Sequence, residues 1–253
     1  MTSLTLGGLV FICLFGAASI AMPMQSRLPK GHLSLESREA IKLATAIVGT
    51  LAALALGLLI ASAKTSYDNA EAALRDSVAR VVLLDRSLAH YGPETAPARA
   101  ELRALIERRL ERPWAETDDD ESSAKDALLD RGIEPVQQAI HSLHPANDTQ
   151  TWLKTHSLEI SSAIAEARWM VTETRLEGLP GPFLAVMVFW LSLLFATFGL
   201  LAPTNGTVVL TIMVCALSVA GAIFLVVDMA HPYRGLIAIS DEPLRAALVE
   251  LGH

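Results

Sequence analysis

Residues 41–63 read IKLATAIVGTLAALALGLLIASA, and this stretch decides the fold. Its one charged residue is Lys42, at the entrance, and Lys64 follows directly after the exit. A helix rises about 1.5 Å per residue and the hydrocarbon core of a bilayer is about 30 Å thick, so about 20 residues cross it. Backbone polar groups find no partners in lipid, so a single crossing segment must be helical. We therefore predict a transmembrane helix here.

Three further windows share this length and this freedom from charge: residues 4–22, 182–201 and 207–227. The first lacks the basic leader of a secretory signal, and Arg27 and Lys30 follow it instead, so we expect a span rather than a cleaved peptide. The last two are joined by Ala202-Pro203-Thr204-Asn205-Gly206, whose Pro and Gly predict a tight turn and an antiparallel hairpin. The chain is thus predicted to be all-α, with four transmembrane helices in two pairs.

A helical extramembrane bundle is expected between spans 2 and 3. Residues 64–181 hold 14 Lys and Arg against 21 Asp and Glu, which accounts for the whole net charge of −7. This acidic balance argues against a nucleic-acid partner. The predicted domains are helices 1 and 2 in residues 1–63, the bundle in 64–181, the hairpin in 182–227 and a C-terminal interfacial segment in 228–253.

Apolar spacing of three, four and seven residues predicts the helices of the bundle. The second span is expected to continue to Tyr91, where Gly92-Pro93 ends it. Further helices are expected at 96–112, 134–143 and 242–251, and a long one is expected from the cap cluster Asn147-Asp148-Thr149 to about Arg175. The inward face of that long helix is predicted to carry Trp152, Leu153, Ile160, Ile164 and Met170.

The positive-inside rule bears on orientation. The loop between the first two spans carries Arg27, Lys30 and Arg38, which places it in the cytoplasm and the central domain outside. The central segment also has basic residues near its membrane ends, but long domains count less in this rule. We expect the central domain to be external.

The sequence offers little catalytic chemistry. It contains no phosphate-binding loop, dinucleotide fingerprint, nucleophile elbow or zinc-protease helix, so we expect no enzyme and no cofactor. Cys13 and Cys215 both lie in apolar windows, where they are expected to be small buried hydrophobes. The acidic run at 118–121 is either a solvated loop or a site for a hard cation, and His141 with His144 is a weak metal pair. We predict no metal site.

Small residues repeat every four positions along the second span. The candidates for helix packing or for lining a pore are Thr45, Gly49, Thr50, Ala53, Gly57 and Ala61. Such a stripe lets helix backbones approach closely, within one subunit or in a dimer. The alternative is that it lines a pore when several copies surround an axis.

The segment after the fourth span mixes charge, an aromatic residue and turn formers: Asp228, Pro232, Tyr233, Arg234 and Gly235. Two interpretations are open. It is either an interfacial belt that anchors the helix end, or a structured contact with the central domain.

Several motifs resemble the bestrophin-like family of bacterial membrane proteins. They are Arg27-Leu28-Pro29, Leu84-Asp85-Arg86 with Ala89-His90-Tyr91-Gly92-Pro93-Glu94, Ala167-Arg168-Trp169, Phe189-Trp190, Phe198-Gly199-Leu200, and Pro232-Tyr233-Arg234-Gly235 with Ser240-Asp241-Glu242-Pro243-Leu244-Arg245. The resemblance covers almost the whole chain. It implies a multi-pass protein of the bacterial inner membrane and an analogy with oligomeric anion channels that have four spans and a large helical domain. The second span here is rich in Ala, Gly and Leu and lacks the aromatic pore constriction of true bestrophins.

The motif residues are also candidates for coupling the domain to the membrane: Asp85, Arg86, His90, Tyr91, Arg168, Trp169, Asp228, Pro232, Arg234 and Gly235. We predict that Arg86, Arg168 or both pair with Asp85 or Asp228.

Two functions remain in view at this point. The first is a homo-oligomeric ion channel or pore lined by the second span, with cations favoured by the acidic domain. The second is a non-conducting scaffold or sensor in the lipid bilayer, whose helical domain binds a ligand or a protein partner that the sequence does not identify.

Overall fold

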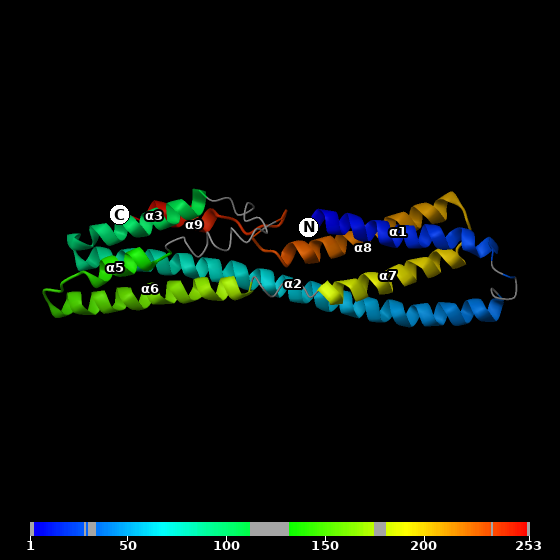
Figure 1. Ribbon diagram of the computed structural model, residues 1–253, viewed down its shortest axis with the longest axis horizontal. Helices are drawn as coiled ribbons and strands as arrows, with labels where there is room; N and C mark the ends of the chain where they lie inside the picture. The colour runs from blue at the N-terminus through cyan, green and yellow to red at the C-terminus, as the bar shows by residue number, and fades with distance from the viewer. Residues whose placement is uncertain are drawn as a thin grey trace. The chain divides into compact units, whose positions relative to one another are not determined.

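The computed structural model describes residues 3–27, 29, 34–111, 132–174, 181–233 and 235–251, and within these ranges all regular structure is helical. The described residues form two compact units. One comprises Met1–Tyr67 with Gly178–His231, here called the membrane unit, and the other comprises Asp68–Glu177 with Pro232–His253, here called the bundle unit. Helix α2 (Leu35–Tyr91) is continuous and contributes to both units (Figure 1).

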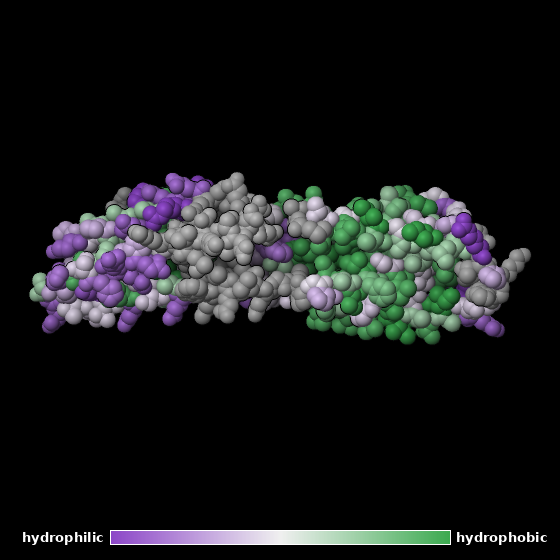
Figure 2. Space-filling view, in the orientation of Figure 1, coloured by the Kyte–Doolittle hydropathy of each residue, from purple (hydrophilic) through white to green (hydrophobic). Residues whose placement is uncertain are grey.

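The membrane unit consists of α1 (Ser3–Arg27), the first part of α2, α7 (Gly181–Leu201) and α8 (Gly206–Met229). All four helices are long and apolar enough to cross a bilayer, which confirms the predicted spans. Its core is built from residues of all four, among them Leu14, Ala52, Met187 and Ile223. Figure 2 shows that the face of these spans turned to the viewer is mainly hydrophobic, as contact with lipid requires.

Small residues set the spacing of the helices in the membrane unit. A Cβ atom at Gly199 of α7 would collide with the backbone carbonyl of Ala18 on α1, so the two backbones lie in direct contact there. Gly7 of α1 similarly faces the Cβ atom of Phe224 on α8. Without a hydrophobic driving force in lipid, close backbone packing of this kind is what holds membrane helices together.

The end of α2 is fixed by the residues predicted to end it. Gly92 has a φ of 141°, which favours glycine, and Pro93 opens the 3₁₀ turn Pro93–Thr95. The buried hydroxyl of Thr95 donates to the carbonyl of Leu88 at 2.7 Å and approaches that of Gly92 at 2.8 Å. The carbonyl of Leu88, in the last turn of α2, thus finds a partner inside the protein.

The bundle unit packs the second part of α2 with α3 (Ala96–Glu111), α5 (Glu134–His141), α6 (Asp148–Thr174) and α9 (Glu242–Glu250). The predicted apolar face of α2 is buried in this core, as Val81, Leu84 and Leu88 show. A hydroxyl pair, Ser87 and Ser157 at 2.9 Å, is buried with it.

The cap of α6 also follows the sequence prediction, because the side-chain oxygen of Asn147 accepts from the amide of Gln150 at 2.8 Å. The inward assignment of Trp152 is wrong, since this residue is 62% exposed.

The two cysteines are free and exposed on the spans, so the expectation that they are buried is also wrong.

Candidate functional site

The stripe of small residues on α2 does not face one neighbour. Thr45 and Gly49 are half-buried, and a Cβ atom at Gly49 would lie 3.0 Å from a methyl group of Leu194 on α7. Ala53, Gly57 and Ala61 are exposed. A helix has 3.6 residues per turn, so positions four apart drift by about 40° per step. The first part of the stripe, Thr45 and Gly49, therefore packs inside the subunit, while Ala53, Gly57 and Ala61 turn away from it.

The membrane-crossing part of α2 is the least covered of the four spans. Only 11% of its apolar window is buried inside the chain, against 22–28% for the other three. Its exposed surface includes the candidate Thr50, the small residues named above and large apolar side chains: Leu43, Ile47, Leu51, Leu54, Leu58 and Ile60. This face is free for lipid or for another subunit.

Hydroxyl groups along α2 already donate within the helix. Thr45 Oγ1 donates to the carbonyl of Ile41 at 2.8 Å, and Thr50 Oγ1 donates to that of Ala46 at 2.9 Å. With their protons engaged, these oxygens retain acceptor lone pairs and no free donor. A surface of this kind can accept from water or coordinate a cation.

A crevice lies between α2 and α7 in the membrane unit, with a volume of about 210 Å³. It is lined mainly by Ala44, Thr45, Val48, Leu193, Leu194 and Thr197, and Ile41 lies at one end of the α2 side. The Thr197 hydroxyl donates to the carbonyl of Leu193 at 2.9 Å, so both threonines of the wall are internally bonded.

Asp85 is buried in the bundle unit, and its partner is Arg99. The Nε and Nη2 atoms of Arg99 donate to the two carboxylate oxygens at 2.7 and 2.9 Å. This hydrogen bonding raises the pKa of Arg99 above its ordinary value, so the guanidinium stays charged. The pair joins α2 to α3. A buried carboxylate requires such compensation.

Arg86 does not pair with Asp85 or Asp228, and the alternative prediction, that Arg168 does so, lies outside the described residues. Arg86 points to the C-terminal helix instead, where its Nη2 atom lies 3.0 Å from a carboxylate oxygen of Glu250. Arg103 of α3 donates to the carbonyl of Leu251 at 3.0 Å. Two arginines thus bind the last turn of α9, where the helix dipole is negative. This arrangement supports the interpretation of the C-terminal segment as a structured contact with the helical domain.

The remaining coupling candidates on α2 behave differently from each other. His90 is exposed, and its Nδ1 atom lies 2.7 Å from the carbonyl of Arg86. Tyr91 is buried, and among the described residues its hydroxyl has no hydrogen-bond partner. Burial raises the pKa of Tyr91, and the nearby charge of Glu94 raises it further.

In the last turn of α8, Asp228 is buried and accepts a hydrogen bond from Ser3 of α1. Pro232 is half-buried, and its carbonyl accepts from the amide of Ile239 at 2.9 Å. Gly235 has a φ of 100°, a backbone conformation that favours glycine. Arg234 and the side chains of Arg168 and Trp169 lie outside the described residues.

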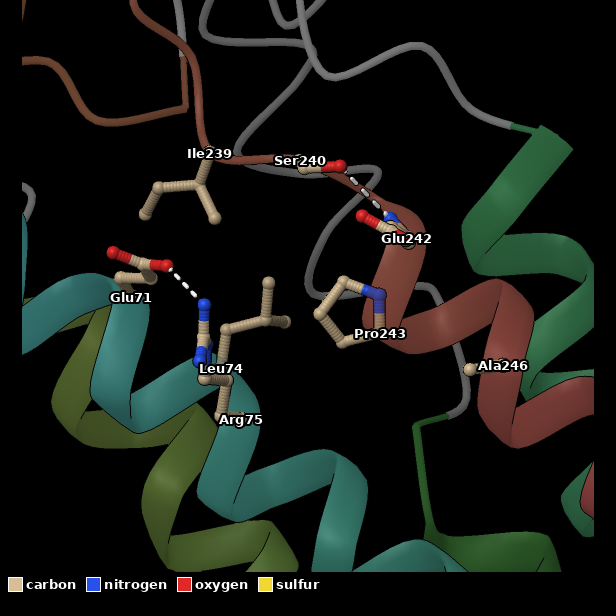
Figure 3. A pocket seen from close by; sticks show the side chains of 8 residues that line it. All are labelled: Glu71, Leu74, Arg75, Ile239, Ser240, Glu242, Pro243 and Ala246. Carbon is tan, nitrogen blue, oxygen red and sulfur yellow. Dashed lines mark hydrogen bonds and ion pairs between the residues drawn. The ribbon is translucent and has the colours of Figure 1, made fainter.

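A pocket of about 300 Å³ lies between α2 and the C-terminal segment, within the bundle unit. Its lining side chains are drawn in Figure 3. The ion pair of Glu71 and Arg75, 2.6 Å apart, forms one wall with Leu74. The other wall is formed by Ile239, Pro243 and neighbouring residues of the C-terminal segment. The pocket is partly apolar and carries both signs of charge.

Metal chemistry finds no support among the described residues, where no group of three or more His, Cys, Asp or Glu side chains is placed to hold an ion. The acidic run at 118–121 lies outside them. Arg99, Arg103, Glu250 and Ser3 were not predicted from the sequence as site residues. The sequence offered one indication of the Asp85 site. The helical periodicity of α2 places this carboxylate beside the apolar face, and therefore next to the core.

Four apolar helices with membrane-crossing length and hydrophobic outer surfaces define a multi-pass helical membrane protein. A family model described as the bestrophin-like domain matches residues 12–244, nearly the whole chain. The chain therefore belongs to the bestrophin-like family. Comparison with curated proteins finds no match, and neither does comparison with solved structures.

Proposed function

We propose that the protein forms a homo-oligomeric ion channel or pore in the bacterial inner membrane, with α2 of each subunit facing the shared axis. The observation that carries the proposal is the uncovered face of α2, which has the lowest buried share of the four spans. Membership of the bestrophin-like family favours an oligomer built around such a helix. Ala53, Gly57 and Ala61 on this face leave room for a path between subunits.

The same face favours cations over anions. Thr50 presents a hydroxyl oxygen whose proton is held by Ala46, and no basic side chain lies between Lys42 and Lys64. The net charge of residues 64–181 is negative, which raises the local concentration of cations at a pore mouth. The basic first loop favours an orientation with the bundle unit in the periplasm.

Native mass spectrometry of the protein in nanodiscs tests the assembly, and a liposome flux assay with K⁺ and Cl⁻ tests conduction. Gly57→Phe is the informative variant, because a Cβ atom at Gly57 meets nothing within 4 Å in the chain. Gly8→Phe on α1 is the matched control, with the same open surroundings. We expect Gly57→Phe to abolish flux and Gly8→Phe to retain it. A monomer, or equal flux in both variants, contradicts the proposal.

The pocket of Figure 3 favours one rival function, that of a non-conducting sensor. Its mixed wall suits a small amphiphilic molecule that carries a charged group, since Arg75 and Glu71 offer both signs beside Leu74 and Pro243. A monomeric protein without flux, together with ligand-dependent thermal stabilisation that Leu74→Trp removes, would favour the sensor.

A further inference from the structure

The crevice between α2 and α7 is an apolar slot open to the bilayer. An apolar cavity of about 150 Å³ holds a benzene ring, so the volume of about 210 Å³ has room for a short hydrocarbon segment. Thr45 and Thr197 are its two polar wall residues, and both donate to carbonyls of their own helices. The two wall hydroxyls therefore have no free donor that an occupant would have to satisfy. A flexible acyl chain suits such a wall, whereas a polar ligand does not.

Basic side chains stand at the mouth of this slot. Seven residues make nearly two turns of helix, so Arg38 lies above Thr45 on the same face of α2. Lys42 lies one turn from Thr45, at the edge of that face. Glu39 projects about 120° away from Thr45 by the same geometry, on the far flank of Lys42 and outside the face that carries the slot. Arg38 is half-buried and Lys42 is exposed.

The slot and the basic residues beyond it together span about one leaflet of a bilayer. Ten residues separate Arg38 from Val48, a rise of about 15 Å along the helix. This is about half of the roughly 30 Å hydrocarbon core. A lipid with its phosphate at Arg38 would therefore lay its chain along Ile41, Thr45 and Val48, in register with the lining of the crevice.

We propose that the crevice between α2 and α7 binds an acyl chain of an anionic phospholipid whose phosphate is held by Arg38 and Lys42. The headgroup end lies at the membrane face that carries the basic first loop. Basic residues at a membrane surface attract anionic lipids. The site belongs to each subunit alone, so the proposal stands whether or not the protein conducts.

Native mass spectrometry of the full-length protein, released from nanodiscs of phosphatidylglycerol and phosphatidylcholine with identical chains, tests the site. We expect one retained phosphatidylglycerol per subunit in the wild type. Thr45→Phe should fill the crevice and remove this lipid. Thr50→Phe, on the exposed face of the same helix, should keep it.

The basic residues are tested through the choice of headgroup. Arg38→Gln with Lys42→Gln should lower the preference for phosphatidylglycerol over phosphatidylcholine on the order of tenfold. The control Arg80→Gln with Arg245→Gln removes the same charge from the bundle unit and should leave the preference unchanged.

Photo-crosslinking of the unaltered protein with a phospholipid that carries a diazirine in its acyl chain gives a test independent of any variant. Label is expected on peptides of both walls, residues 41–48 and 193–197. Equal lipid retention in Thr45→Phe and Thr50→Phe, no headgroup preference in the wild type, or label spread evenly over the spans would overturn the proposal.

Discussion

The hydroxyl of Ser3 donates to the carboxylate of Asp228 at 2.5 Å, and this bond joins the first turn of α1 to the last turn of α8 across 225 residues. Asp228 is only 1% exposed, and a buried carboxyl group needs such hydrogen-bond partners. The positive end of the α1 dipole lies at Ser3 and favours the same carboxylate. This hydrogen bond thus connects α1 to α8, the first and last spans of the membrane unit, at their ends.

Ser3→Ala should lower the stability of the membrane unit. Loss of a hydrogen bond to a charged group costs about 1.5–3 kcal/mol. The control is Ser218→Ala, whose hydroxyl is exposed and bonds only to the carbonyl of Val214 in its own helix, among the bonds described. Thermal unfolding of the purified protein, followed by circular dichroism, should give a lower midpoint for Ser3→Ala than for Ser218→Ala. Equal midpoints would show that the bond to Asp228 contributes nothing measurable.

Gly199→Ala should separate α1 from α7. The added methyl group would meet the backbone carbonyl of Ala18, which cannot move aside like a side chain, and overpacking of this kind costs about 1–3 kcal/mol. Gly221→Ala on α8 is the matched control, because nothing lies within 4 Å of its Cβ position. That change should stabilise the helix slightly, since alanine is the better helix former. Opposite shifts of the unfolding midpoint are expected, and shifts of the same sign would contradict the close contact.

Arg99→Gln should destabilise the bundle unit more than any exposed arginine does. It leaves the buried carboxylate of Asp85 without its bidentate partner, which costs about 3 kcal/mol. Arg75→Gln removes an exposed pair with Glu71 and should cost less than about 1 kcal/mol. Chemical denaturation of the full chain distinguishes the two. A similar loss in both variants would mean that solvent or other groups stabilise Asp85.

The spans and the helix ends could be predicted because they depend on local properties. A charge-free window of about 20 residues can satisfy its backbone in lipid only as a helix. Gly92 and Pro93 end α2 because of their own backbone preferences. The face of α2 with Val81, Leu84 and Leu88 followed from periodicity alone.

The pairing of charges could not be predicted in the same way. Adjacent residues on a helix point about 100° apart, so Asp85 and Arg86 do not face each other. Asp85 therefore finds Arg99 on α3, and Arg86 finds Glu250 on α9. Both partners depend on how three helices pack, which no local pattern records.

Burial was harder to predict than helix position. Trp152 and Leu153 are adjacent, and only Leu153 can enter the core. The exposed cysteines show a second reason why burial is hard to predict. An apolar side chain in a span packs equally well against lipid and against protein.

Tyr91→Phe should leave the bundle unit as stable at pH 7 as the wild type, or more stable. The Tyr91 hydroxyl is buried and has no partner among the described residues, and an unsatisfied buried group costs about 1–3 kcal/mol. Burial raises its pKa in the folded protein, so the unfolded chain loses this proton first. The contribution to stability is therefore constant below the unfolded pKa of about 10 and is lost as pH rises through the folded value.

Unfolding midpoints measured between pH 8 and 11 should thus fall less steeply for Tyr91→Phe than for the wild type, in the range roughly above pH 10. Tyr67→Phe is the control, since Tyr67 is half-buried and its ring, which keeps its contact with Lys64, is unchanged. This variant measures the general effect of removing a tyrosine hydroxyl. A lower midpoint for Tyr91→Phe at pH 7 would instead mean that the hydroxyl has a partner in the folded protein, and the residue would then join Asp85 as a polar contact that holds the bundle together.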